Sequence, residues 1–234
     1  GAVEQHMSAP DAALQRARAN VDAWSNALDN GAEAIVMTAS GCGAMVREYG
    51  HLLANDTRYA QRAARVGAHT RDLAEVVQSL PLEDIAWRGL SEQQLAYHPP
   101  CTLQHGQKLP GIVEGLLARL GVNLKPVRDA HLCCGSAGAY SILQPELSGA
   151  LRERKLEALS QGQPERILTA NIGCLHHLQS GCDVPVEHWI EALDRAGVGF
   201  TLVRHENAGG FFAEGHWHMT GDLPVLVATL GPGV

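Results

Sequence analysis

The sequence predicts an α/β fold with short, mostly parallel strands and flanking helices. Apolar runs of strand length alternate with segments of helical periodicity, which favours a parallel sheet with helices on its faces. Hydrophobic residues make up 45% of the 234 residues but aromatic residues only 5%, which suits a fold built from Ala, Leu and Val. The conspicuous cysteines follow strand-like runs. Parallel sheets bind ligands at the carboxyl ends of their strands, so these cysteines mark the candidate site.

Periodicity and helix-stop residues define the individual elements. Apolar residues recur at helical spacing from Leu14 to Leu28, and Asn30-Gly31 ends that helix. Short apolar runs bounded by glycine and proline turns are expected to form buried strands. We expect helices at 12–29, 41–53, 56–78, 108–121 and 145–162, and strands at 33–39, 94–98, 123–128 and 165–171.

The chain contains an internal repeat. "GAEAIVMTASGCGAMV" (31–46) and "QPERILTANIGCLHHL" (163–178) both read as an acidic residue, an apolar strand, a Gly-Cys pair and a helix. Gly135 ends a Cys-Cys-Gly motif at 133–135. Extending the alignment backwards places Gly1 opposite Gly135, so we expect the chain to begin inside an earlier copy of this motif. A natural start of the chain is the alternative.

Four cysteines come from three predicted loops at one edge of the sheet. "HPPC" supplies Cys101, "HLCCG" supplies Cys133 and Cys134, and "NIGC" supplies Cys174. Thiolate-only ligation selects iron–sulfur clusters or zinc, and structural zinc sites usually use CxxC pairs, which are absent here. Nearby glycines would let the backbone approach a bulky cluster. An iron–sulfur cluster, zinc and buried structural cysteines all remain open at this point.

Three segments, "HPPCTLQHGQ", "LCCGSAGAYSILQPELSGALRERKLEAL" and "ILTANIGCLHHLQ", resemble the cysteine-rich CCG domain of heterodisulfide reductase subunits and related iron–sulfur oxidoreductases. Two further segments, "GAEAIVMTASGCGAMVREYGHLL" and "VPVEHWIEAL", narrow the resemblance to the C-terminal half of glycolate oxidase (glycolate dehydrogenase) iron–sulfur subunits. That family carries two CCG repeats. The resemblance implies a remnant of the first repeat at 1–95 and a complete second repeat at 96–197.

The resemblance also implies a function. It implies an electron-transfer subunit that receives electrons from a flavin-containing partner and holds an iron–sulfur cluster of the [4Fe–4S] kind. The implied ligands are Cys101, Cys133, Cys134 and Cys174, with Cys42 a cofactor-binding cysteine of the first repeat that has lost its partners. The family's CxxCxxCxxxCP motifs are absent. The alternatives are a zinc-stabilised or redox-inactive interaction fragment, and a partial gene fusion.

Charge and composition exclude other classes of function. The formal charge is −7 and the basic residues are scattered, so we expect no nucleic-acid partner. No apolar run reaches the ~18 residues that a membrane-spanning helix needs, and the cysteine usage suits a reducing compartment. We expect a cytoplasmic protein that reaches the inner face of the membrane only through its complex. The histidines beside the cysteine loops are expected to form hydrogen bonds or lie half-exposed, with ligation or tuning of a metal as the alternative: His98, His105, His131, His176 and His177.

The tail, residues 198–234, resembles the pyrimidine-binding domain of thiamine diphosphate enzymes of the acetolactate synthase type. Its "RHE" ends in Glu206, which matches the glutamate that hydrogen-bonds the cofactor in that family, and Gly231-Pro232-Gly233 matches a turn. The resemblance implies a foreign or fused α/β fragment that begins near Gly197. A chimera of two partial coding regions is the simpler explanation, and a genuine fusion is the alternative.

Overall fold

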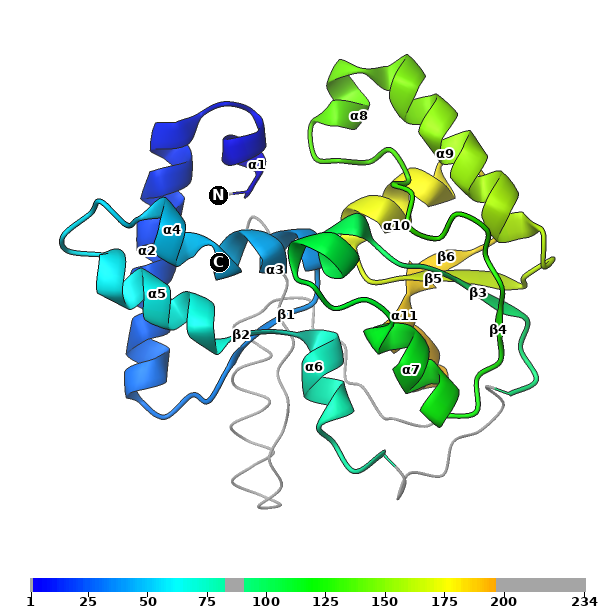
Figure 1. Cartoon of the computed structure of the whole chain (residues 1–234), viewed down its shortest axis with the longest axis horizontal. Helices are drawn as coiled ribbons and strands as arrows, with labels where there is room; N and C mark the ends of the chain where they lie inside the picture. The colour runs from blue at the N-terminus through cyan, green and yellow to red at the C-terminus, as the bar shows by residue number, and fades with distance from the viewer. Residues whose placement is uncertain (1, 83–90, 197–234) are drawn as a thin grey trace.

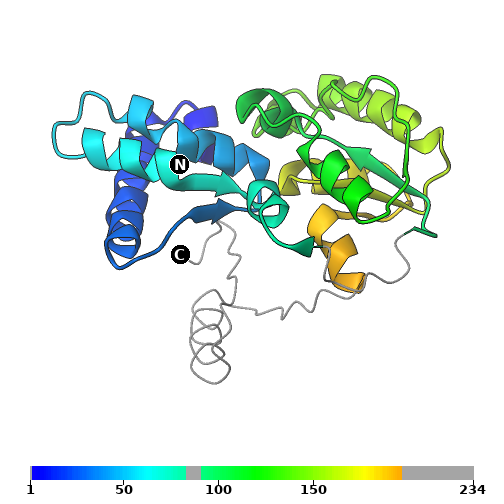
Figure 2. The ribbon, with the colours of Figure 1, turned by 60° about the horizontal axis from the view of Figure 1, so that its bottom comes forward.

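The computed structural model describes residues 2–82 and 91–196, which form two lobes side by side (Figures 1 and 2). The first lobe holds the elements up to β2, and the second holds β3 onward. The elements run in the order α1(Ala2–His6), α2(Pro10–Asp29), β1(Ile35–Met37), α3(Ser40–Arg47), α4(Tyr49–Leu52), α5(Ala60–His69), β2(Thr70–Asp72), α6(Leu73–Gln78), β3(Leu95–His98), the π-helical turn η2(Thr102–Gly106), α7(Ile112–Arg119), β4(Leu124–Lys125), α8(Tyr140–Leu143), α9(Pro145–Ser160), β5(Arg166–Thr169), α10(Ile172–Gln179), β6(Val186–His188) and α11(Trp189–Arg195).

The second lobe is a four-stranded sheet in the order β4-β3-β5-β6, with every neighbouring pair parallel. Helices α9 and α10 cover one face and helices α7 and α11 cover the other (Figure 1). Side chains alternate between the faces of a strand. Ala96 therefore packs in the core beneath α9 and α10, whereas Leu95 and Tyr97 pack in the core with α7 and α11. The predicted α/β class with parallel strands is confirmed.

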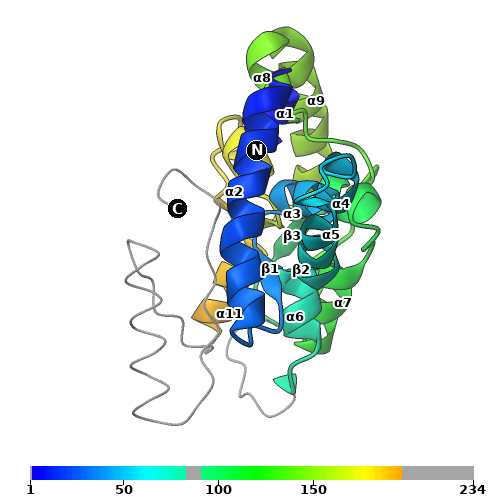
Figure 3. The same ribbon diagram turned by 90° about the vertical axis from the view of Figure 1, so that its left-hand side faces the viewer.

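The first lobe has a smaller sheet, in which β1 pairs in parallel with β2. Its core lies between this sheet and helices α2 and α5, where Val21, Val46 and Val66 are almost fully buried. The long helix α2 runs along the outer side of this lobe (Figure 3). The lobe thus has a hydrophobic core separate from the two cores of the four-stranded sheet.

The predicted helix at 56–78 is wrong. The chain instead forms α5, the strand β2 and then α6. Residues 70–72 leave the helical path because they pair with β1, and Asp72 then starts α6 as its N-cap. Its side chain accepts a hydrogen bond from the Ala74 N–H, and Glu75 completes a capping box. Asp72 and Glu75 were the signal in the sequence that a new helix begins there.

The two Gly-Cys segments have the same local structure. Cys42 is the third residue of α3, which follows β1, and Cys174 is the third residue of α10, which follows β5. The expected helix at 41–53 divides at Glu48 into α3 and α4. The division of the chain into a first repeat at 1–95 and a second at 96–197 stays a prediction. The tail at 198–234, including Glu206, lies outside the described residues.

Hydrogen bonds join the lobes where the strands end. The Ser40 N–H donates to Ala170 O over 3.2 Å, and Gln107 Nε2 donates to Ser40 O over 3.1 Å and to Asp72 Oδ2 over 2.9 Å. The carboxyl ends of β1 and β5 are therefore neighbours, and the start of α3 faces the loops of the second lobe.

His188 makes a further contact between the lobes. Its Nε2–H donates to Thr38 O over 2.9 Å, and its Nδ1 accepts from the Ile190 N–H at 3.3 Å. Both bonds require the neutral ring with the proton on Nε2. Burial lowers the pKa of His188 to about 4.

None of the helices in the described part of the chain combines the length and the apolar character that a membrane crossing needs.

We predict that His188 makes folding stability depend on pH. Its pKa is about 4 in the fold against 6.5 ordinarily, so the unfolded chain binds the proton more tightly and stability is lost as the pH falls from about 7 to 4. We expect a loss of roughly 2 kcal/mol, less than the full shift implies because the residue keeps some exposure. Urea unfolding at pH 7, 5.5 and 4.5 measures it. His188→Gln keeps an amide donor for Thr38 and should lose this part of the pH dependence, whereas an unchanged pH profile in that variant would contradict the assignment.

Candidate metal centre

The cysteines of the second lobe gather at the carboxyl edge of its sheet. Cys101 follows β3 after two buried prolines, and Cys174 lies in the first turn of α10 directly after β5. Cys133 and Cys134 lie in the loop between β4 and α8. Because β3 pairs in parallel with both β4 and β5, all three chain segments leave the sheet at the same edge. Parallel topology thus brings together residues that are far apart in the sequence.

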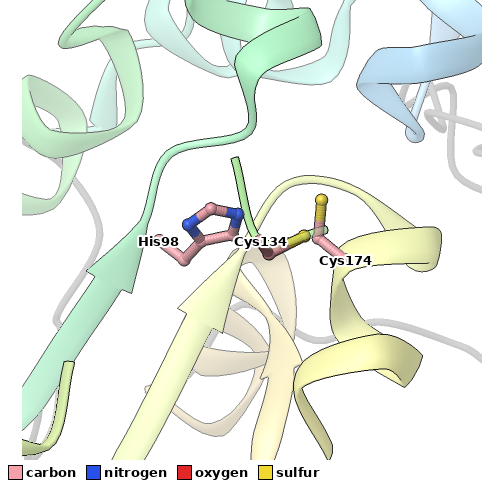
Figure 4. A group of neighbouring side chains, drawn as sticks. All are labelled: His98, Cys134 and Cys174. Carbon is pink, nitrogen blue, oxygen red and sulfur yellow. The ribbon is translucent and has the colours of Figure 1, made fainter. Parts of the chain in front are cut away.

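Three donor atoms form the tightest group. One ring nitrogen of His98 and the sulfurs of Cys134 and Cys174 lie within 4.8 Å of one another, and all three residues are buried. Figure 4 shows the imidazole at the end of its strand facing the two sulfurs, which come from the loop and from the helix. Cys101 and Cys133 lie outside this trio.

The remaining two thiols join the trio through contacts between sulfurs. Cys101 hydrogen-bonds Cys133, Cys133 hydrogen-bonds Cys134, and Cys134 hydrogen-bonds Cys174. The structure therefore brings all four predicted site cysteines into one continuous group. Whether they ligate a metal is a separate question, and the ligand assignment stays a prediction.

The pKa values of these thiols alternate along the row. The hydrogen bond to Cys133 raises the pKa of Cys101, while the hydrogen bonds from Cys101 and then Cys134 lower the pKa of Cys133. Likewise the pKa of Cys134 is raised by its contact with Cys133, and that of Cys174 is lowered by its contact with Cys134. Neighbouring thiols in contact cannot both ionise at low cost, so ionising all four requires a positively charged group among them.

Backbone and amide donors point at two of the sulfurs. The Gly135 N–H donates to Cys133 Sγ over 3.3 Å, and Asn171 Nδ2 donates to Cys174 Sγ over 3.4 Å. The pKa values of these two sulfurs are lowered mainly by the contacts with Cys101 and Cys134, and the two donors add to that effect because they stabilise the thiolate form. Donors of this kind also raise the reduction potential of a cluster held by the sulfurs.

The glycine of Cys-Cys-Gly is required by the backbone. Gly135 has φ +95°, and a Cβ there would lie 2.5 Å from Ser148 O. Ser148 fixes the same turn from α9, because its Oγ donates to Gly135 O over 2.9 Å and lies 3.1 Å from His177 Nε2. A larger residue would push the two cysteines away from the helix that holds them.

Lys155 is a site residue that the sequence reasoning missed. It is 2% exposed, and its Nζ donates to Asp129 O over 2.7 Å and to Ala130 O over 3.3 Å, which fixes the loop before the two cysteines. Burial lowers its pKa, while the nearby thiolates oppose that shift. A lysine four residues after Leu151 and four before Leu159, in the apolar stripe of α9, was the available signal.

Two cysteines lie apart from the row. Cys42 packs against the core of the first lobe, and burial raises its pKa. Within the described ranges it belongs to no group of three potential metal ligands. The Cys182 thiol donates to Leu178 O and Val184 O over 3.5 and 3.4 Å.

The other predicted histidines differ from His98. His105, His131 and His176 are exposed, and His177 is held by Ser148. In the part of the chain that the structure describes, both ring nitrogens of His98 are buried without an oxygen or nitrogen partner, and the ring contacts the sulfur of Cys174, whose pKa it helps to lower. The soft thiols and the buried imidazole fit a soft, positively charged group such as zinc or an iron–sulfur cluster.

Fold and site together define a cysteine-rich α/β module that gathers thiols from three loops at the carboxyl edge of a parallel sheet. Residues 95–179 match the model of the cysteine-rich domain (CCG) family. The chain is 53% identical over 196 residues to the glycolate oxidase iron-sulfur subunit of Escherichia coli K12, which covers 84% of this chain and 48% of that protein. It is 30% identical over 184 residues to a probable glycolate oxidase iron-sulfur subunit of Bacillus subtilis 168, with coverages of 78% and 41%.

A third relative is matched over most of its length. Lactate utilization protein A of Anoxybacillus flavithermus is 30% identical over 173 residues, which are 70% of this chain and 71% of that protein. The chain belongs to the CCG cysteine-rich domain family of glycolate oxidase iron–sulfur subunits and their relatives. It spans about half the length of the two glycolate oxidase relatives, 48% and 41%.

The tail has a match of its own. Residues 177–234 match the N-terminal TPP binding domain of thiamine pyrophosphate enzymes, so the predicted resemblance of the tail is confirmed. This match begins inside α10, and its described part, up to residue 196, is packed into the four-stranded sheet, where β6 pairs with β5 and Trp189 is fully buried. The predicted junction near Gly197 stays a prediction.

We predict that Gly135→Ala destabilises the cysteine loop. The left-handed backbone costs a residue with a Cβ about 1–2 kcal/mol, and the contact with Ser148 O adds to that, so we expect a loss of at least about 2 kcal/mol. Gly149→Ala is the matched control, since Gly149 lies in α9 with nothing within 4 Å of an added Cβ. It should gain up to about 1 kcal/mol. Urea unfolding of the full chain measures both, and equal stabilities of wild type and Gly135→Ala would refute the argument.

Proposed function

We propose that this chain is the cluster-holding part of an iron–sulfur electron-transfer subunit of a 2-hydroxy acid oxidoreductase of the glycolate oxidase type. The observation that carries the proposal is the row of four contacting thiols at the carboxyl edge of the sheet. The thiols of this row can all ionise only if they bind a soft cation. The relatives are named iron-sulfur subunits, and their names favour an iron–sulfur cluster as that cation. When bound, a cluster supplies reversible one-electron transfer.

The ligands in this proposal are Cys101, Cys133, Cys134 and Cys174, and the cluster is of the [4Fe–4S] kind, which four thiolates commonly hold. The Gly135 N–H and Asn171 orient and stabilise the thiolates. Lys155 holds the loop and adds a positive charge near the sulfurs. Residues 96–197 are the metal-binding repeat of this proposal and 1–95 the remnant, in which Cys42 has lost its former partners.

The electrons come, in this proposal, from a flavin-containing partner subunit that oxidises glycolate or a similar 2-hydroxy acid. The names of the relatives motivate this choice, since they include glycolate oxidase and lactate utilization proteins. The partner would bring any association with the membrane, and the site of action would be the cytoplasmic side. The chain's own role is to hold the cluster and to exclude water from it with buried residues such as Leu178.

A zinc site is the second candidate. His98, Cys134 and Cys174 with one more thiol would satisfy the four-coordinate geometry of zinc. A zinc-stabilised module would fold around the metal without transferring electrons.

Anaerobic reconstitution distinguishes the two. We expect the full chain treated with iron and sulfide to retain both, to turn brown and to give an electron paramagnetic resonance signal after reduction. Cys134→Ser and Cys174→Ser should each lose most of the bound iron, because each removes a buried sulfur of the tightest donor group. Cys182→Ser and Cys42→Ser are the matched controls and should keep it. A colourless, silent protein with one zinc per chain would reject the electron-transfer function.

A further inference from the structure

His98 is a buried polar residue at the thiol centre. It is 1% exposed, and neither ring nitrogen has an oxygen or nitrogen partner among the described residues. The ring contacts the sulfur of Cys174, whose pKa it helps to lower. A buried polar group without a partner costs about 1–3 kcal/mol. Such a cost calls for a compensating interaction, and a ring nitrogen can either hydrogen-bond or ligate a metal ion.

The strand fixes where the imidazole lies. His98 is the last residue of β3, pairs with Thr169 of β5, and is followed by two buried prolines. Alternation along the strand places it on the face of Ala96, which packs with Cys134 and Cys174, and opposite to Tyr97. The ring therefore faces the sulfurs, as Figure 4 shows.

The distances suit ligation. Metal–sulfur bonds of about 2.3 Å and metal–nitrogen bonds of about 2.0–2.1 Å put tetrahedral donors roughly 3.5–3.8 Å apart. The ring nitrogen of His98 and the two sulfurs already lie within 4.8 Å of one another. The nitrogen is therefore within reach of a metal centre that the two sulfurs would hold.

The geometry points to His98 as an imidazole ligand of the metal centre, which makes the site a mixed histidine–cysteine site. This inference rests on the proposed function, because it takes the metal centre to be an iron–sulfur cluster. With four thiols and one imidazole, the chain offers five protein donors, so a cluster held here would have an imidazole among its ligands. A neutral imidazole in a thiolate environment raises the reduction potential of a cluster.

Two half-buried histidines, His177 and His188, differ from His98 in their hydrogen bonds. His177 lies near the Cys-Cys-Gly turn, but its Nε2 is 3.1 Å from Ser148 Oγ. His188 uses both nitrogens in hydrogen bonds to Thr38 and Ile190. Each already has an oxygen or nitrogen partner, which His98 lacks among the described residues.

Isotope labelling of the full wild-type chain tests the inference without relying on a variant. The chain is prepared with [¹⁵N]histidine and reconstituted with iron and sulfide, and pulsed electron paramagnetic resonance records the nitrogen couplings of the reduced cluster. We expect a strong coupling that changes from the ¹⁴N to the ¹⁵N pattern on labelling. Couplings that labelling leaves unchanged would come from backbone N–H groups and would overturn ligation by histidine.

Variants then assign the coupling to one ring. His98→Leu should lose the coupling, His98→Cys should lose it and lower the midpoint potential, and His177→Gln should keep it. Loss of the coupling in His177→Gln with retention in His98→Leu would overturn the assignment. Iron uptake separates the two levels of failure: a chain that takes up no iron defeats the proposed function itself, whereas a chain that takes up iron without a histidine coupling defeats only this inference.

Discussion

The mutual repulsion of thiolates is the constraint on which the site depends. Four thiols in contact at a largely buried edge of a sheet stay protonated in part, and the alternating pKa shifts of Cys101, Cys133, Cys134 and Cys174 express that conflict. A bound cation removes the conflict because each thiolate then faces positive charge. The buried side chain of Lys155 also stabilises the thiolates, though less than a metal ion would, because its positive charge lies near Cys133 and Cys134.

The supporting contacts explain how the chain keeps such a group together. Position 135 requires glycine, because a Cβ there would clash with the carbonyl oxygen of Ser148. Parallel pairing of β3 with β5 brings the ends of both strands to one edge, so that loops from distant parts of the sequence meet. The helices supply Ser148 and Lys155 from α9 and Cys174 from α10. Rigid elements therefore carry most of the side chains that orient the row.

Much of this was predictable from the sequence, because its strongest signals are local. Short apolar runs followed by Gly-Cys or Pro-Pro-Cys predict strand ends with thiols, and β1, β3 and β5 lie within the predicted strands. The strand β2 was missed because three residues between two helical segments carry too little periodicity to interrupt a helix. The sequence did not predict the positions of His98 and Lys155 at the site as clearly as it predicted the strand ends. Whether a polar residue in an apolar pattern is buried, and what it then faces, depends on tertiary contacts between segments distant in the sequence.

The junction between the lobes links the Gly-Cys segment of the first lobe, Gly41-Cys42, to the thiol row. Asn171 donates to Cys174 Sγ through Nδ2, while its Oδ1 lies 3.5 Å from the Gly41 N–H. Its amide is oriented by the start of α3, the helix that carries Cys42. Gln107 reinforces the junction by donating to Ser40 O and to the Asp72 carboxylate, whose pKa burial raises. The first lobe thus supports the site through its backbone. The Gly41 N–H orients the Asn171 amide that donates to Cys174, and Ser40 O accepts a hydrogen bond from Gln107. The Gly-Cys turn of the first lobe is therefore part of the support for Cys174.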